Sequence, residues 1–443
     1  MYSPEVESLL KSKKIKVGDR VRIEKKGMVY EGILMPRIEL GDSSSLVVKL
    51  DNGYNIGVRI ERDVKIKKIG RGKAIKFKAS GVRIERDAAK PTVSVLGCGG
   101  TIASRVEYTT GAVFPAFSPG DLLLSFPELK EVANINGRKL FDLLSEDITP
   151  SHWQIIAKEV AKEIRGSDGI VLMHGTDTLH YTSAALSFML QNLPVPVVLV
   201  GSQRSSDRGS SDNAMNLLSS VLTAAKSDIA EVTVCMHGSS SDDFCFVHQG
   251  TKVRKLHTSR RDAFQSVNAL PFAKVWYKEG KIEYLRNDFN KRDKKVFRLD
   301  DKINPNVGLV YVHPGIKPEF ISSLSEFYEG IVLVVTGMGN VPANPSNDKF
   351  AKSIVPSIKN LIASGIPVAV APQTLYGRIN MNIYSAGRML NETGVIGQYC
   401  DWLPETAFVK LMWVLGHTKN MDKIKEMMLK NYAGEISERS EVE

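Results

Sequence analysis

Residues 169–202 read GIVLMHGTDTLHYTSAALSFMLQNLPVPVVLVGS, and this stretch decides the fold. An almost continuous apolar run, GIVLMHG, is followed by a helical pattern, TSAALSFMLQNL, and then by a second apolar run, PVVLVGS. Near-continuous apolar strands separated by helices are typical of a parallel sheet that is covered on both faces. The stretch therefore predicts a strand, a crossover helix and a second parallel strand.

The same alternation continues on both sides of this stretch. VSVLG and GDLLLSFPELKEVA precede it, and NAMNLLSSVLTAAK and VTVCMHG follow it. A charged segment then interrupts the pattern, and VGLVYVHPG, GIVLVVTGMGN and IPVAVAPQ begin a smaller α/β unit. We therefore predict an α/β body of two parallel-sheet domains, residues 91–290 and 307–443, with a charged linker at 291–306.

The first ninety residues differ from the body in both pattern and charge. Short alternating runs separated by KKG, GDSSS and DNG predict a small antiparallel β-barrel domain over residues 1–85. The first ninety residues hold 22 Lys and Arg against 12 Asp and Glu, so they carry the whole formal charge of +10. This charge favours a polyanionic partner, although a solvated lysine-rich surface, common in heat-adapted proteins, explains it equally well.

The composition excludes several classes of protein. With 43% hydrophobic and 24% charged residues, a chain of 443 residues is globular and long enough for two or three domains. We expect a cytoplasmic protein with no membrane contact, because no apolar run is long enough to span a bilayer or to act as a signal peptide. The four cysteines show no CxxC pairing, which argues against a disulfide framework or a zinc site.

The glycine-rich turn GCGGTIASR (97–105) follows an apolar strand and has two interpretations. Its first two glycines begin a dinucleotide-binding fingerprint, but Ile102 stands where the third glycine should be, and no P-loop lysine follows. Neither phosphate-binding motif is complete. The turn therefore presents Thr101 as a candidate at a strand end, which is where ligands bind in parallel sheets.

HGTDT places more polar groups at the end of the next strand. Thr176, Asp177 and Thr178 precede a predicted helix, whose free N–H groups stabilise developing negative charge and could help to form an oxyanion hole. The alternative is that one of the three merely caps the helix. A lysine of TKVRK (251–255) favours catalysis, because a threonine hydroxyl needs a base and a lysine is one if burial lowers its pKa.

Two histidines end apolar strands of the predicted sheet. We predict that His174 and His237 are hydrogen-bonded structural residues, and that the chain has no metal site, because His237, His248 and His257 lack the spacing of zinc ligands.

From about residue 91 to its end, the chain resembles the L-asparaginase family of amidohydrolases. The resemblance rests on GGTIAS, on HGTDT, and on a K…F.S.N pattern that begins at Lys255. Members of this family hydrolyse a side-chain carboxamide through two threonines, the second grouped with an aspartate and a lysine. The resemblance implies Thr101 as the first nucleophile, Thr176 as its partner, and Lys255 with Asp177 as the activating pair.

The same resemblance implies the substrate contacts. SEDI is similar to the substrate-clamping segment of the family, so Ser145 and Glu146 would hold the amino-acid head group, with Asp177 on its α-ammonium. YTTGAV resembles the mobile lid, whose tyrosine would be Tyr108.

Plain asparaginases lack the basic N-terminal barrel. GDRVRIEKKGMVYEGILMPR and KLDNGYNIGVRI, joined to an asparaginase-like body, resemble the D-subunit family of archaeal glutamyl-tRNA(Gln) amidotransferases. That resemblance implies a homodimer within a heterotetramer, in which this subunit hydrolyses glutamine or asparagine and passes ammonia to an E subunit. The E subunit would use ATP and Mg²⁺ to amidate Glu-tRNA(Gln), and this subunit would need no cofactor.

Two other functions remain open. One is a free-standing cytosolic L-asparaginase whose barrel adds only stability or an oligomer contact. The other is a tRNA-binding module with an inactive amidase body, against which the intact set of Thr101, Thr176, Asp177 and Lys255 argues.

Overall fold

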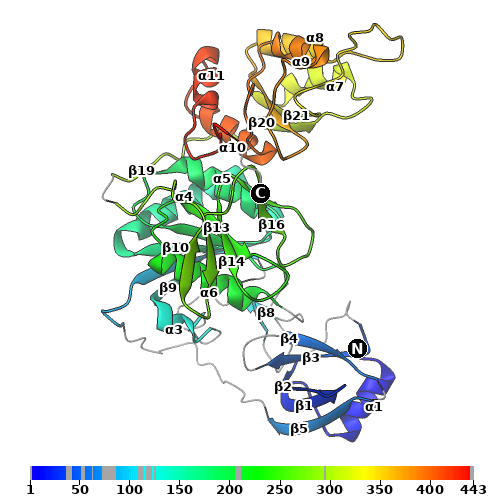
Figure 1. Cartoon of the computed structure of the whole chain (residues 1–443), viewed down its shortest axis with the longest axis vertical. Coiled ribbons are helices and arrows are strands. Elements are labelled where there is room, and N and C mark those ends of the chain that lie inside the picture. Colours follow the sequence, from blue (N-terminus) through cyan, green and yellow to red (C-terminus); the bar gives the residue numbers. More distant parts are fainter. Residues whose placement is uncertain are drawn as a thin grey trace.

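The computed structural model describes twelve stretches of the chain. Two predicted site residues, Thr101 and Tyr108, lie outside them. Figure 1 shows the largest sheet in the middle of the molecule, with a smaller sheet at each end. The described stretches are residues 2–35, 42–50, 55–61, 63–71, 86–100, 102, 104–106, 113–115, 122–123, 126–204, 211–293 and 296–439.

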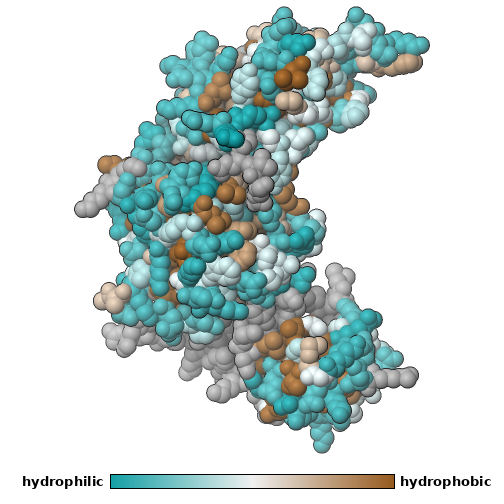
Figure 2. All heavy atoms as spheres, viewed as in Figure 1, coloured by the Kyte–Doolittle hydropathy of each residue, from teal (hydrophilic) through white to brown (hydrophobic). Residues whose placement is uncertain are grey.

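The N-terminal part is a five-stranded antiparallel sheet, in the order β4-β3-β2-β1-β5, which confirms the small antiparallel domain predicted from the sequence. In β1, Val21 and Ile23 are fully buried, while Arg22 between them is partly exposed. Helix α1 adds Val6 and Leu10 to the same core. In the view of Figure 2 the outer side of this domain is hydrophilic, and a patch of hydrophobic residues lies on the part of its face nearer the rest of the molecule. The elements are α1 (Pro4–Ser12), β1 (Asp19–Lys25), β2 (Met28–Leu34), β3 (Ser45–Leu50), β4 (Asn55–Arg59) and β5 (Lys65–Arg71).

The central sheet has eight strands in the order β18-β17-β14-β13-β12-β10-β6-β9. The predicted strand, crossover helix and strand of residues 169–202 are β10, α5 and β12, and β10 pairs in parallel with β12 and β6. Five neighbouring strands are parallel, whereas β14, β17 and β18 extend the sheet antiparallel. The strands are β6 (Thr92–Gly99), β9 (Asn134–Leu143), β10 (Gly169–Met173), β12 (Val197–Val200), β13 (Val232–His237), β14 (Cys245–Gln249), β17 (Ala273–Trp276) and β18 (Lys281–Tyr284).

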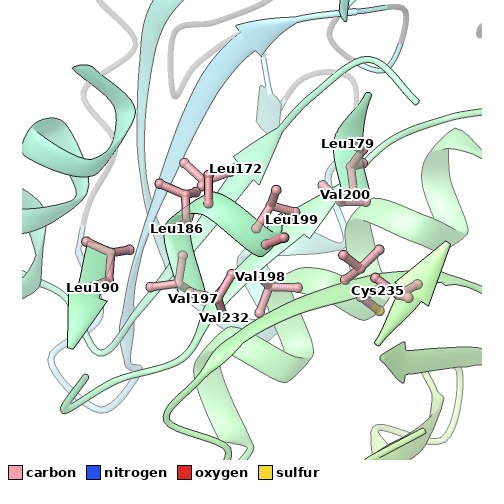
Figure 3. Close-up of a cluster of buried hydrophobic side chains, with 14 of the residues drawn as sticks. Leu172, Leu179, Leu186, Leu190, Val197, Val198, Leu199, Val200, Val232 and Cys235 are labelled. Carbon is pink, nitrogen blue, oxygen red and sulfur yellow. The ribbon is translucent and has the colours of Figure 1, made fainter. Parts of the chain in front are cut away.

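Helices bury the central strands on both faces. All four residues of β12 are fully buried, as the continuous apolar run predicts. Figure 3 shows their side chains in one cluster with Leu172 of β10 and with Leu179 and Leu186 of α5. The helices are α3 (Leu129–Val132), α4 (Pro150–Glu163), α5 (Leu179–Met189) and α6 (Asn213–Lys226), and the short 3₁₀ turn η2 (Ser145–Asp147) follows β9.

The C-terminal part is built on a three-stranded parallel sheet, β20-β21-β22. Helix α10 joins it to the central part, because Trp413 of α10 stacks on Phe188 of α5 with ring centroids 5.9 Å apart. Both aromatic rings belong to the hydrophobic core of the central sheet. The elements are β20 (Val307–Tyr311), α7 (Pro318–Ser323), β21 (Gly330–Val335), α8 (Val355–Ala363), β22 (Val368–Pro372), α9 (Ser385–Asn391), α10 (Pro404–Leu415) and α11 (Met421–Leu429).

Short strand pairs complete the structure. The hairpin of β15 (Val253–Lys255) and β16 (Phe264–Ser266) carries the lysine-containing segment singled out in the sequence. Among the helices of the described stretches, none combines the length and the apolar character needed to cross a membrane. The remaining pairs are β7 (Ser104–Val106) with β8 (Val113–Pro115), and β11 (Leu190–Gln191) with β19 (Arg298–Leu299).

Candidate active site

The turns that follow β6 and β10 pack directly against each other. Gly100 has a φ of +80°, and a Cβ atom on it would lie 2.6 Å from the backbone nitrogen of Gly175. Only glycine tolerates both this left-handed backbone and so close an approach. Strands β6 and β10 are parallel neighbours, so the glycine turns that follow them come together at the carboxyl ends of the strands.

Lys255 connects the second of these turns to the β15–β16 hairpin. Its Nζ donates to Thr176 Oγ1 at 2.9 Å and to Asp177 Oδ1 at 2.7 Å. Lys255 is the last residue of β15, where it pairs with Phe264. Its side chain is 10% exposed and that of Asp177 is 66% exposed, so the ion pair runs from the protein toward solvent. Three of the four residues predicted to be catalytic thus lie in direct contact.

Lys252, three residues earlier, has a different partner. Its Nζ lies 2.9 Å from Asp401 Oδ2, and neither side chain is more than 1% exposed. Burial lowers the pKa of Lys252, and the nearby Asp401 carboxylate opposes that shift. Since Lys252 is held in this buried ion pair, Lys255 is the lysine of the segment that contacts Thr176.

The side chains of the HGTDT turn do not cap the helix that follows. Thr178 is the N-cap residue of α5, but its Oγ1 donates to the Ser145 carbonyl oxygen at 2.5 Å and makes no capping bond. Thr176 and Asp177 accept hydrogen bonds from Lys255 instead. The helix-capping alternative is therefore wrong. Asp177 donates its N–H to Ser145 Oγ, whereas the N–H of Thr176 has no partner among the described residues.

The predicted substrate-clamping segment lies beside this turn. Ser145 is 4% exposed and belongs to η2, and its Oγ accepts the N–H of Asp177 at 3.2 Å. Gly175 has no room for a side chain here, because a Cβ atom would lie 2.8 Å from the Cβ of Ser145. Glu146, the next residue of η2, is exposed to solvent. The structure thus brings Ser145 into contact with the turn and leaves the carboxylate of Glu146 open.

Both histidines predicted to be structural are hydrogen-bonded. His174 Nδ1 lies 2.7 Å from the Gly175 carbonyl oxygen, and burial lowers the pKa of His174 to about 4. His237 Nδ1 lies 2.5 Å from Asn216 Oδ1, and its Nε2 lies 3.2 Å from Asp242. Within the described ranges, no group of three or more His, Cys, Asp or Glu side chains is placed to hold a metal ion.

Sequence reasoning missed two polar links between the catalytic segment and the C-terminal part. Arg254 forms an ion pair with Glu405 of α10 at 2.9 Å, although 151 residues separate them and no sequence signal connects them. Asn268 has a left-handed backbone (φ 58°) and donates through Nδ2 to the carbonyl oxygens of Leu375 and Asp401. The K…F.S.N pattern pointed to Asn268 without indicating this role. Both links hold β15 and β16 in place beside Thr176.

Three family models match the chain in succession. Residues 15–69 match the GatD N-terminal domain, residues 92–290 match the N-terminal domain of asparaginase, and residues 306–428 match the glutaminase/asparaginase C-terminal domain.

Similar proteins extend over nearly the whole chain. The chain is 52% identical to the D subunit of glutamyl-tRNA(Gln) amidotransferase from Pyrococcus furiosus, over 98% of this chain and 97% of that protein. It is 47% identical to the protein of the same name from Methanothermobacter thermautotrophicus, over 100% of this chain and 98% of that protein. Among solved structures, the thermostable L-asparaginase from Thermococcus kodakarensis has a TM-score of 0.68 at 32% identity, over 78% of this chain and 99% of that one.

Proposed function

This chain belongs to the family of glutamyl-tRNA(Gln) amidotransferase D subunits, and from that premise we propose that it hydrolyses the side-chain amide of glutamine or asparagine. The ammonia released serves to convert Glu-tRNA(Gln) to Gln-tRNA(Gln) on a partner E subunit. That subunit uses ATP and Mg²⁺, and the chain described here works in the cytoplasm as a homodimer within a heterotetramer and without a cofactor of its own.

One observation carries this proposal: the Nζ of Lys255 contacts both Thr176 Oγ1 and Asp177 Oδ1. A threonine hydroxyl is a weak nucleophile until a base takes its proton. Lys255, when neutral, is within hydrogen-bond reach to do so, and the Asp177 carboxylate stabilises the ammonium that results. A purely structural ion pair would not need a hydroxyl group as a third member.

The chemistry has two steps. A threonine oxygen attacks the carboxamide carbon while its proton passes to Lys255, directly or through water, and backbone N–H groups stabilise the oxyanion. The C–N bond then breaks, and the nitrogen takes up that proton and leaves as ammonia. Water attacks the resulting ester, releases the acidic amino acid and restores the hydroxyl. Thr101 and Thr176 are the two candidate nucleophiles, and their order is not assigned.

We propose the substrate contacts from the resemblance to the family, and the same arrangement supports them. Ser145 and Glu146 hold the amino-acid head group, and Asp177 contacts its α-ammonium as well as Lys255. The exposed carboxylates of Asp177 and Glu146 support this role, because an ammonium group binds where anionic oxygens remain open. Tyr108, which lies outside the described residues, is proposed as a substrate contact only because YTTGAV resembles the lid segment of the family.

The test is ammonia release from glutamine and from asparagine by the purified chain, alone and then with its E subunit and Glu-tRNA(Gln). Strong stimulation by the complex is the expected result. Full activity alone, unchanged by these additions, would support a free-standing asparaginase. No ammonia under any condition would overturn both hypotheses and leave a tRNA-binding module.

A further inference from the structure

A chain of buried hydrogen bonds lies behind the HGTDT turn. Trp153 Nε1 of α4 donates to Thr182 Oγ1 of α5 at 3.1 Å. Thr182 Oγ1 lies 3.0 Å from His174 Nε2, and His174 Nδ1 lies 2.7 Å from the carbonyl oxygen of Gly175. None of the three side chains is more than 4% exposed. This series of hydrogen bonds therefore connects helices α4 and α5 to the peptide group that precedes Thr176.

The groups at the two ends of this series, the Trp153 indole and the Gly175 carbonyl, fix the direction of every hydrogen bond in it. An indole nitrogen can only donate, so Thr182 Oγ1 accepts from Trp153. A carbonyl oxygen can only accept, so His174 carries its proton on Nδ1 and donates to Gly175. Neutral His174 then has a lone pair on Nε2, which accepts the hydroxyl proton of Thr182. One tautomer of His174 and one rotamer of the Thr182 hydroxyl satisfy all four groups.

The Gly175 carbonyl and the Thr176 N–H belong to the same peptide group. This peptide is planar and trans, so the two bonds point in opposite directions, and a hydrogen bond that holds the oxygen also sets the direction of the N–H. The oxygen is turned toward buried His174, so the N–H points away from it. That N–H has no hydrogen-bond partner among the described residues. The side chain of Thr176 is held by its hydrogen bond from Lys255.

We propose that Trp153, Thr182 and His174 form a positioning relay that aims the N–H of Thr176 at the oxyanion formed during amide hydrolysis. This inference rests on the proposed function, because it assigns that N–H to the same reaction. Burial keeps the imidazole neutral, so the relay keeps one direction of hydrogen bonding at neutral pH. Its members are positioning residues, since none of them contacts the reacting atoms.

The central experiment replaces Thr182 by valine, which keeps the shape and removes the hydroxyl. His174 then loses the donor to its Nε2 and Trp153 loses its acceptor, so the imidazole is held only through Nδ1 and its ring is no longer fixed from both sides. Loss of one oxyanion donor lowers kcat by about 10²–10³, so a misdirected donor should lower kcat for glutamine by roughly 10- to 100-fold. KM should change less than about threefold, because the donor acts on the transition state.

Two variants separate positioning from packing. Thr182→Ser keeps the hydroxyl and should restore most of the rate, although it loses a methyl group from the core. Ser187→Ala removes another hydroxyl of α5, which bonds to the Ser183 carbonyl oxygen and lies outside the relay, and should leave kcat unchanged. If the valine variant does not fold, Trp153→Phe removes only the far end and should lower kcat by a smaller factor.

All variants are assayed as the full chain together with the E subunit and Glu-tRNA(Gln). Wild-type protein that releases no ammonia from either amino acid would overturn the proposed function. Wild-type activity together with an unchanged kcat in a folded Thr182→Val, or in Trp153→Phe if the valine variant does not fold, would overturn the relay alone. An equal loss of kcat in Thr182→Ser and Thr182→Val would also overturn it, because the hydroxyl would then be irrelevant.

Discussion

Lys252 and Lys255 lie three residues apart on one segment, and each forms an ion pair with an aspartate. The two pairs differ chiefly in how far they are buried. Lys252 and Asp401 lie 2.9 Å apart, and both side chains are at most 1% exposed. Lys255 and Asp177 lie 2.7 Å apart, and Asp177 is 66% exposed. The residue types and the distances are nearly the same. The surroundings alone therefore separate a pair that ties the central part to the C-terminal part from a pair that contacts a candidate nucleophile.

The difference teaches how a segment can supply both a scaffold and a base. A buried ion pair fixes geometry, but a lysine sealed from solvent cannot exchange a proton with a substrate. A pair with one open partner can do so, and the buried pair beside it restricts its movement. The Lys252 pair, with the Asn268 bonds to the same Asp401 region, thus supports the hairpin that carries Lys255.

The largest effect should come from Lys255→Met. Removing a positioned general base costs about 10²–10⁴ in rate, so we expect kcat for ammonia release to fall roughly 10³-fold. The partly exposed Asp177 can be solvated when its partner is lost, so the melting temperature should change by only a few degrees. Ammonia release and thermal unfolding are measured on the same preparations. A variant that keeps a third or more of the wild-type rate would remove Lys255 from the chemistry.

Lys252→Met should show the opposite pattern. It leaves the Asp401 carboxylate buried without its cation, which typically destabilises a protein by about 3–5 kcal/mol. We expect a large drop in the free energy of unfolding, measured by denaturant titration, with near-normal turnover in the fraction that remains folded.

The matched control for that variant is the double substitution Lys252→Met with Asp401→Asn. Asparagine keeps an oxygen that can accept the N–H of Ser437, as Asp401 does at 2.9 Å, and it removes the uncompensated charge. The double variant should recover much of the lost stability. If it is no more stable than Lys252→Met, the loss comes from packing and the contrast between the two pairs is weakened.

A smaller effect, set by pH, extends the contrast to His174. Burial lowers the pKa of His174 from 6.5 to about 4. Between pH 4 and pH 6.5, His174 is therefore mostly protonated in the unfolded chain and mostly neutral in the folded chain. Its contribution to stability is therefore complete above pH 6.5 and is lost as the pH falls toward 4. The loss is on the order of 3 kcal/mol for a shift of this size.

His174→Asn removes this titration and leaves the other buried histidines unchanged. Its free energy of unfolding should fall less steeply than that of the wild type between pH 6.5 and 4, as followed by urea unfolding at several pH values. Parallel curves for the two proteins would show that His174 binds its proton at the same pH in the folded and the unfolded chain, so that burial does not lower its pKa.

The pattern of apolar residues, and the polar residues placed at the ends of the predicted strands, predicted much of this arrangement. The apolar runs of residues 169–202 predicted β10, α5 and β12, because strands buried on both faces leave a continuous hydrophobic signal. The antiparallel edge was missed, since β14, β17 and β18 are short and mix apolar with polar residues. Spacing could group Thr176 with Asp177, and the family's K…F.S.N pattern selected Lys255, but without that resemblance the residues could not choose between Lys252 and Lys255. Their partners, Asp401 and Asp177, lie far away in the sequence, and burial is a property of the folded chain.

The smallest effect should come from a third lysine–carboxylate pair, Lys281 with Glu283 on β18. Their charged atoms lie 3.4 Å apart, and the side chains are 62% and 41% exposed. Water solvates both charges when the pair is broken, so exposed pairs contribute about 1 kcal/mol or less. Lys281→Met should therefore change neither turnover nor the free energy of unfolding by more than that amount. A loss as large as that of Lys252→Met would show that burial does not govern these pairs, because the exposed pair would then behave like the sealed one.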